Sequence, residues 1–186
     1  RDALVWWVVD PRSKESMELI RHQAGHPKIV GMKIGPTYHN YPFRRYARVI
    51  LDLASELDLA VLTHSGQPND MPGDIVAYVN HYPDVRFVIA HFGNCLDFQG
   101  HLRAFKKCTS KRCFVDTSSA MSMYCDHIEN GVRQLGVSRF LFGTDTPLYS
   151  IAAQCARILE SNLTVQQKRA ILGDNARKLL LSHHPK

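Results

Sequence analysis

The sequence predicts an α/β fold of the (β/α)8, or TIM-barrel, type. Six short apolar runs recur at intervals of roughly 25 to 31 residues, and the segments between them carry helix signals. A strand, a helix and two loops fill such an interval. Potential ligand side chains also stand where several of these runs end, which is where catalytic groups lie in such folds.

The apolar runs are nearly continuous, as expected for parallel strands that are covered on both faces. We expect strands at residues 4–9, 29–34, 60–64, 86–91, 113–117 and 139–145. An open, doubly wound sheet would show the same alternation of strands and helices. The polar residues at the carboxyl ends of consecutive strands favour the barrel.

The helix signals are local. They consist of a capping serine, a proline that suits a first helical position, and a capping box, at Ser13, Pro42 and Thr164 with Gln167. We expect the helix after the capping box to end before Gly173, and a last helix to bury Leu179 and Leu180.

The chain has 186 residues, of which 45% are hydrophobic, and no low-complexity linker divides it. We therefore expect a single barrel domain over residues 1–186. Six units fill this length, whereas a closed eightfold barrel takes about 250 residues. We expect about two further units to precede Arg1 in the parent protein.

Composition argues against several classes of partner. The net charge of +6 comes from dispersed residues, and the small basic cluster at Lys106, Lys107, Lys111 and Arg112 lacks the interleaved aromatic residues of a nucleic-acid surface. No apolar stretch approaches the roughly 18 residues of a membrane span, and no export signal is visible. We expect a cytoplasmic protein that binds a small-molecule substrate, without nucleic acid or membrane, and that can form homo-oligomers.

The five cysteines indicate a reduced, cytosolic environment, because their number is odd and none forms a CxxC pair. Cys108 and Cys113 lie close in sequence across an expected turn from helix to strand. That spacing alone is weak support for a bridge, so we expect free, structural thiols.

Three strand ends carry the residue types of a metal site: His64, His91 and Asp145. Imidazole nitrogen and carboxylate oxygen bind zinc, and a catalytic site keeps one position open for water. A single histidine here would more often be a structural residue, and Asp145 alone could cap a turn. Three such placements together favour a divalent metal, with zinc as the first choice.

The same segments carry a family resemblance. GMKIGP, LTHSG, DVRFVIAHFG, CFVDTSS, RFLFGTDTP and ILGDNARKLL follow one another in order. Over about residues 4 to 181 the chain resembles the metal-dependent amidohydrolase superfamily, in the branch that contains aminocarboxymuconate semialdehyde decarboxylase and related hydrolases.

The resemblance implies roles for individual residues. His64 and Asp145 correspond to metal ligands, and Asp145 also moves protons for the metal-bound water. His91 corresponds to a catalytic histidine, or to a ligand of a second metal. Lys33 corresponds to a substrate or water contact, with a carboxylated bridging lysine and a buried structural lysine as alternatives, and His39 lies in a loop that could touch substrate.

The first strand of this superfamily carries a His-x-His pair that completes the metal site, and this chain has none. Two protein ligands, or three with His91, hold zinc poorly, so we expect incomplete metal occupancy in this chain.

The expected activity is metal-dependent hydrolysis of a small amide, ester or lactone, with Asp145 accepting the proton of the water and His91 polarising the carbonyl. Non-oxidative decarboxylation of an aromatic or unsaturated carboxylic acid is the enzymatic alternative. A metal-free barrel remnant or binding module is the third reading. The GxSxG nucleophile motif and glycine-rich phosphate loops are absent.

Overall fold

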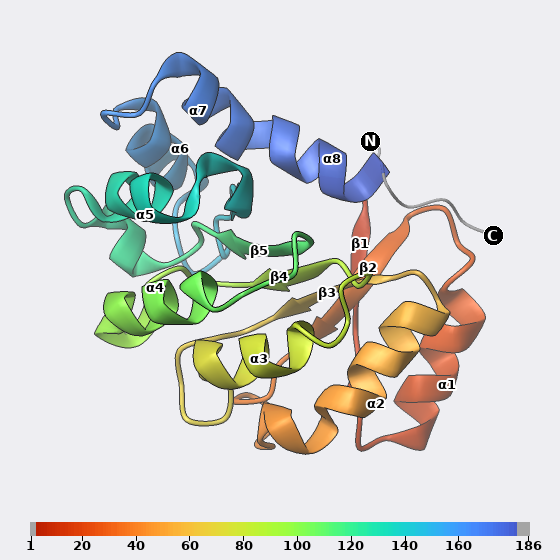
Figure 1. Cartoon of the computed structure of the whole chain (residues 1–186). Helices are drawn as coiled ribbons and strands as arrows, with labels where there is room; N and C mark the ends of the chain where they lie inside the picture. The colour runs from red at the N-terminus through yellow and green to blue at the C-terminus, as the bar shows by residue number, and fades with distance from the viewer. Residues whose placement is uncertain (1–2, 182–186) are drawn as a thin grey trace.

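A computed structural model describes residues 3–181. Its strands form one parallel sheet whose spatial order is the chain order (Figure 1). They are β1 (Val5–Val8), β2 (Ile29–Ile34), β3 (Ala60–Thr63), β4 (Phe87–Ile89), β5 (Cys113–Asp116) and β6 (Phe140–Leu141). All six expected strands are present, each within the expected range.

The helices follow the strands. The α-helices are α1 (Lys14–Gln23), α2 (Phe43–Glu56), α3 (Pro72–Val79), α4 (Phe98–Lys106), α5 (His127–Leu135), α6 (Ile151–Leu159), α7 (Val165–Arg169) and α8 (Asn175–Leu181). Short 3-10 turns are η1 (Asn94–Leu96), η2 (Ala120–Met123) and η3 (Val137–Arg139), and η4 (Ala170–Asp174) is a π turn. Within residues 3–181, no helix has the length and apolar character needed to cross a bilayer.

The strand order confirms the barrel type. Each strand pairs in parallel with the next one along the chain, from β1 through β6, whereas a doubly wound sheet reverses its order at a switch point. The recorded ladders join β1 to β2 and so on to β6, and none joins β6 back to β1 in the described part of the chain. The structure is therefore a partial barrel.

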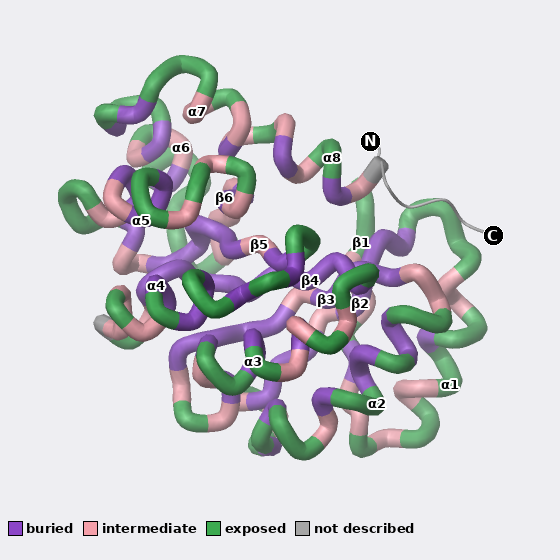
Figure 2. The backbone as a smooth tube through the Cα atoms, in the orientation of Figure 1, coloured by how far each residue is buried: buried purple, intermediate pink, exposed green. Residues whose placement is uncertain are grey.

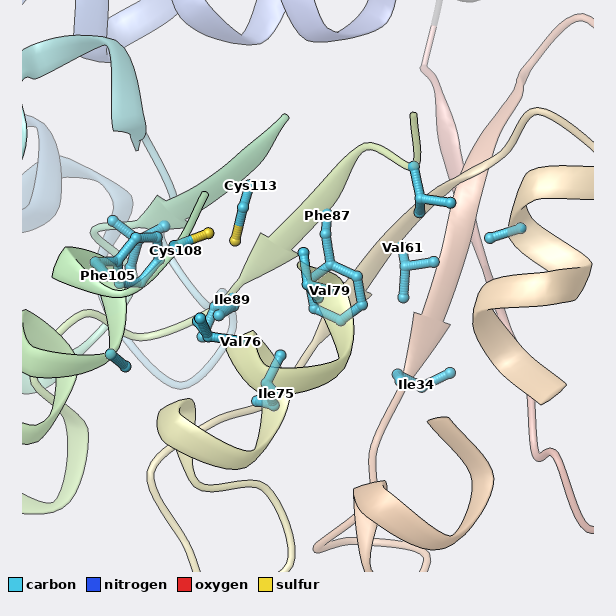
Figure 3. Packing of buried hydrophobic residues seen from close by; sticks show 14 of the residues in the cluster. Ile34, Val61, Ile75, Val76, Val79, Phe87, Ile89, Phe105, Cys108 and Cys113 are labelled. Atoms are coloured by element: carbon cyan, nitrogen blue, oxygen red, sulfur yellow. The ribbon is translucent and has the colours of Figure 1, made fainter. Parts of the chain in front are cut away.

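The outer face of the sheet holds the main core. Alternate strand residues such as Val61, Phe87 and Ile89 point toward the helices and meet Ile75 and Val79 of α3 (Figure 3). Figure 2 shows the buried segments following the strands and the inner sides of the helices. Phe87 is fully buried, and such burial contributes about 2 to 3 kcal/mol per large apolar side chain.

The inner face holds a second, smaller cluster. Val88 and Leu141 of the sheet pack with Leu179 of α8, and Trp6 joins them, whereas Trp7 points to the outer core. Helix α8 therefore lies against the inner face, on the side where β1 begins (Figure 1).

Local signals were accurate at helix starts and wrong at one helix end. Ser13 caps α1, and Thr164 with Gln167 forms the expected capping box. Pro42 stands one position earlier than expected, as the N-cap of α2. The helix does not end before Gly173, because α7 continues through the π turn η4 directly into α8. Gly173 lacks the left-handed conformation that a terminating glycine adopts.

Buried polar contacts tie the end of β3 to the end of β4. The Ser65 hydroxyl donates to the carbonyl oxygen of Ala90 at 2.5 Å, and His101 Nε2 lies 3.2 Å from Ser65 Oγ. A neutral His101 carries one N–H, which donates either from Nε2 to Ser65 Oγ or from Nδ1 to the Asp97 carbonyl oxygen, 3.1 Å away. Ser65 follows His64 and Ala90 precedes His91, so these bonds fix the spacing of the two candidate histidines.

The close approach of β1 to β2 on the inner face predicts a cost for a side chain at Gly31. An added Cβ would lie 2.3 Å from Trp6 Cζ3 and 2.6 Å from the Ala60 carbonyl oxygen. We expect Gly31→Ala to lower the free energy of unfolding by about 1 to 3 kcal/mol in urea titrations. Gly25→Ala is the matched control, since no atom lies within 4 Å of its added Cβ. Equal stability of the two variants would contradict this packing.

Burial of His101 predicts a pH dependence of stability. Burial lowers the pKa of His101 to about 4 in the folded chain, whereas the pKa of a histidine in an unfolded chain is about 6.5. Between these values the unfolded chain binds the extra proton, so stability is complete above pH 6.5 and falls as the pH drops toward 4. We expect His101→Gln to remove about 3 kcal/mol of this loss.

The measurement is the free energy of unfolding in urea at several pH values between 4 and 7. The wild-type chain, measured over the same pH range, is the reference. An unchanged slope in His101→Gln would show that His101 is not held neutral by the fold.

Candidate active site at the strand ends

A cavity of about 540 Å³ opens along the inner face toward the carboxyl ends of the strands. Its polar lining consists of Lys33, His91, Asp116, Ser118 and Asp145. Its walls and floor are apolar and come from the sheet and α8, among them Trp6, Leu62, Val88, Leu141 and Leu179. The cavity thus combines an apolar body with a few converging polar groups, as small-molecule sites do.

His64 follows β3 and is held by the buried carboxylate of Asp70. Its Nδ1 lies 2.9 Å from Asp70 Oδ2, which also accepts from the Thr37 hydroxyl at 2.8 Å. Burial alone would raise the pKa of Asp70, but the hydrogen bonds from His64 and Thr37 outweigh it, and the pKa lies below its usual value. A carboxylate only accepts, so His64 carries a proton on Nδ1 and, when neutral, a lone pair on Nε2.

His91 follows β4 and is oriented by the end of β5. Its backbone N–H donates to Asp116 Oδ1 at 2.9 Å, and its Nδ1 lies 2.8 Å from Ser118 Oγ. The Ser118 hydroxyl donates to Asp116 Oδ1 at 2.5 Å, so the proton of the His91 contact is on Nδ1. His91 therefore also presents Nε2 as a lone pair.

Burial sets the protonation of His91. It lowers the pKa of His91, while the nearby Asp116 acts in the opposite direction and His64 adds to the lowering. The imidazole is consequently neutral near pH 7. Its ring centroid lies 5.0 Å from that of His64, so the two strand ends bring both histidines together.

The backbone is strained at both residues expected to be catalytic. His91 has φ 67° and Asp145 has φ 52°, and among the described residues only six that are not glycine have positive φ. This left-handed conformation is uncommon for side chains with a Cβ and often marks functional positions. The chain changes direction at these residues, two positions after the end of β4 and four positions after the end of β6.

Lys33 places a cationic group in the cavity. Burial lowers the pKa of Lys33, and the carboxylates of Asp116, Asp145 and Asp70 partly offset this effect. Among residues 3–181 its ammonium group forms no salt bridge or hydrogen bond. It is therefore available to an anionic group that enters the cavity.

Asp145 and His39 are placed differently. Asp145 lies four residues after the end of β6, half-buried, and lines the cavity with Lys33 and His91. His39 lies in the loop after β2, outside the residues that line this cavity, with its ring centroid 6.4 Å from that of Tyr41. A substrate contact by His39 stays a prediction.

The donors fit a divalent cation in kind but not in number. His64 and His91 each present a free Nε2 while the other ring nitrogen is hydrogen-bonded, which is how metal-binding histidines are held. Yet no group of three His, Cys, Asp or Glu side chains among residues 3–181 is arranged to hold a metal ion. The described residues thus supply two imidazole donors and not a complete metal site.

Sequence reasoning assigned no role to Asp70, Asp116 or Ser118. Asp116 belongs to the CFVDTSS motif, at the end of an expected strand, and that position was the available signal. Asp70 and Ser118 lie in loops, and only the folded contacts with His64 and His91 show what they do.

Comparison with known proteins shows the family and the fold of the chain. The family model described as Amidohydrolase matches residues 3–181. No curated protein sequence matches the chain. The solved 2,6-dihydroxybenzoate decarboxylase from Rhizobium is 13% identical with a TM-score of 0.72, covering 96% of this chain and 71% of that one.

Two further solved structures share the fold. A dihydroxybenzoic acid decarboxylase from Polaromonas, with bound manganese, is 12% identical with a TM-score of 0.68, covering 94% of this chain and 67% of that one. An uncharacterized TIM-barrel protein from Bordetella bronchiseptica is 15% identical with a TM-score of 0.75, covering 94% and 65%. At these identities the likeness concerns the fold, a TIM barrel of which this chain forms a part. The match to the family model over residues 3–181 makes the chain a member of the amidohydrolase family.

Proposed function

We propose that this chain carries the active-site residues of an enzyme that decarboxylates a small aromatic or unsaturated carboxylic acid without oxidation. The observation that carries the proposal is the free ammonium group of Lys33 in a cavity with apolar walls. Such a cavity suits a flat apolar body with one carboxylate, because the cation offsets the cost of removing the carboxylate from water.

Each residue has one role in the proposed reaction. Lys33 binds the substrate carboxylate, and the ring rests against Leu62, Val88 and Leu141. The bond between the ring carbon and the carboxyl carbon breaks, carbon dioxide leaves, and a proton takes its place on the ring carbon. His91, neutral in the resting site, takes a proton on Nε2 and passes it to the ring carbon, and because burial lowers the pKa of His91 the imidazolium gives up this proton readily.

Asp145 exchanges protons between His91 and solvent. It is half-buried at the mouth of the same cavity, whereas the deeper Asp116 is already occupied by His91 and Ser118. The fold similarity to two decarboxylases of hydroxylated benzoates supports this reaction class. The manganese in the Polaromonas enzyme supports a divalent cation, to which His64 and His91 would contribute Nε2 donors; zinc stays a prediction.

Hydrolysis of a small amide, ester or lactone is the second candidate. It is favoured by the lone pair on His91 Nε2 next to the Asp145 carboxylate, because two such bases can activate a water molecule. Products separate the two reactions. Carbon dioxide formed without uptake of water indicates decarboxylation, and an acid with an amine or alcohol indicates hydrolysis.

Neutralising Lys33 tests the carboxylate contact. We expect Lys33→Met to lower kcat/KM about 10- to 100-fold on hydroxylated benzoates, as expected for the loss of a charged hydrogen bond. Carbon dioxide release by the purified enzyme is the measurement. Lys28→Met, at an exposed position just before β2, is the control. Wild-type kcat/KM in Lys33→Met would remove the basis of the proposal.

Asp145 is tested by an isosteric change. Asp145→Asn should reduce turnover at least 100-fold while circular dichroism and unfolding midpoint stay at wild-type values, because it removes the proton-exchanging group and little packing. The exposed Asp84 gives the control variant Asp84→Asn. Full activity of Asp145→Asn would exclude Asp145 from either reaction.

A further inference from the structure

Two cysteines that are five residues apart meet in the outer core, away from the candidate active site. Cys108 follows α4 and Cys113 opens β5, and both belong to the main apolar cluster. Figure 3 shows the two sulfur atoms pointing toward one another. The thiols are free, and the neutral Cys108 thiol donates to the Ser110 carbonyl oxygen. The two sulfurs lie close enough for the Cys113 thiol to donate to Cys108 when Cys108 is ionised.

The turn between them is fixed from one side by Arg139. Its Nη1 donates to the carbonyl oxygens of Ser110 and Cys113 at 2.5 and 2.8 Å. Cys108 Sγ itself lies 3.7 Å from the Ser110 carbonyl oxygen. These contacts hold the turn in one arrangement, in which the two sulfurs face each other (Figure 3).

The surroundings make the two thiols unequal. The hydrogen bond from Cys113, together with the positive charge of Arg139, lowers the pKa of Cys108 to about 7, although burial opposes this. The same hydrogen bond and complete burial raise the pKa of Cys113. Since the thiolate is the reactive form, Cys108 is the nucleophile of the pair and Cys113 keeps its proton.

Access agrees with this division. Cys108 keeps 8% of its surface exposed and Cys113 keeps none, so a reagent from solvent reaches Cys108 first. Four exposed residues around the turn are basic, namely Lys106, Lys107, Lys111 and Arg112. Their field concentrates anions, which favours a reagent with carboxylate groups.

We propose that Cys108 and Cys113 form a thiol–disulfide exchange site for an anionic low-molecular-weight disulfide of the glutathione type. The Cys108 thiolate attacks one sulfur of this disulfide, forms a mixed disulfide and releases one thiolate. Cys113 then attacks Cys108 Sγ, loses its proton to the released thiolate or to solvent, and expels the second thiol. The chain loses two electrons and two protons, and the small disulfide becomes two thiols.

The test is incubation of the full chain with glutathione disulfide near pH 7, followed by intact mass and peptide mapping. We expect a bond between Cys108 and Cys113 with no glutathione retained at either residue. Cys113→Ala should stop the reaction at a glutathione adduct on Cys108, and Cys108→Ala should abolish reaction at the pair. Cys113→Ser serves the same purpose if the alanine variant fails to fold, and Cys155→Ala is the control.

The pH dependence of alkylation provides an independent readout. Iodoacetamide should modify Cys108 with a midpoint near pH 7, and Arg139→Gln should move this midpoint upward, with Arg139→Lys restoring it in part. Cys95 is the internal comparison. It is an exposed residue, and partial desolvation of its thiol raises the pKa of Cys95. At pH 7 a thiol with a pKa near 7 is ionised roughly tenfold more than an ordinary one.

Two results would overturn the proposal. One is an alkylation midpoint of Cys108 at or above that of Cys95. The other is reaction of glutathione disulfide at exposed cysteines only, with Cys108 and Cys113 still reduced in the folded chain. Neither readout depends on the enzymatic activity.

Discussion

The pairing of every strand with its successor in the chain is the constraint on which the rest of this structure depends. Parallel pairing in chain order brings all carboxyl ends to one edge and leaves one face of the sheet to the helices that return between strands. Lys33, His91 and Asp116 therefore line one cavity, and His64 lies beside His91, although the four residues come from four different strands or the positions just after them. The chemistry of the mouth is a consequence of the ladder and not of any single motif.

Sequence reasoning succeeded where a signal lies within a few residues of the feature. Continuous apolar runs predicted the strands, and the capping box at Thr164 predicted a helix start, because each depends on its own neighbours. The placement of His64 and His91 followed, since a residue just after a parallel strand has to lie at the edge of the sheet. The hydrogen bonds of Asp70 and Ser118 join separate loops, so no local pattern contained them.

The inner face of the sheet is divided along its length. Val88 and Leu141 pack against Leu179 of α8, whereas Lys33 and Asp116 line the cavity. Alternation places every second residue of a strand on this face, and Leu62 and Val88 pair in register beside Lys33, so apolar walls flank the cation. Helix propensity alone does not determine where α8 packs, and the uninterrupted helix through Gly173 is what carries Leu179 to the sheet.

Strand β5 carries Cys113 of the thiol pair at one end and Asp116, which orients His91, at the other. Cys113 opens the strand and faces the outer core, whereas Asp116 closes it and faces His91 on the inner side. Residues three apart in a strand point to opposite faces, so the sheet separates the thiol pair from the cavity. Oxidation of the pair can then influence the cavity only by moving the backbone of β5. A short strand that is paired on both sides transmits such a movement as a whole, and the bond from His91 N to Asp116 Oδ1 is the first contact that would change.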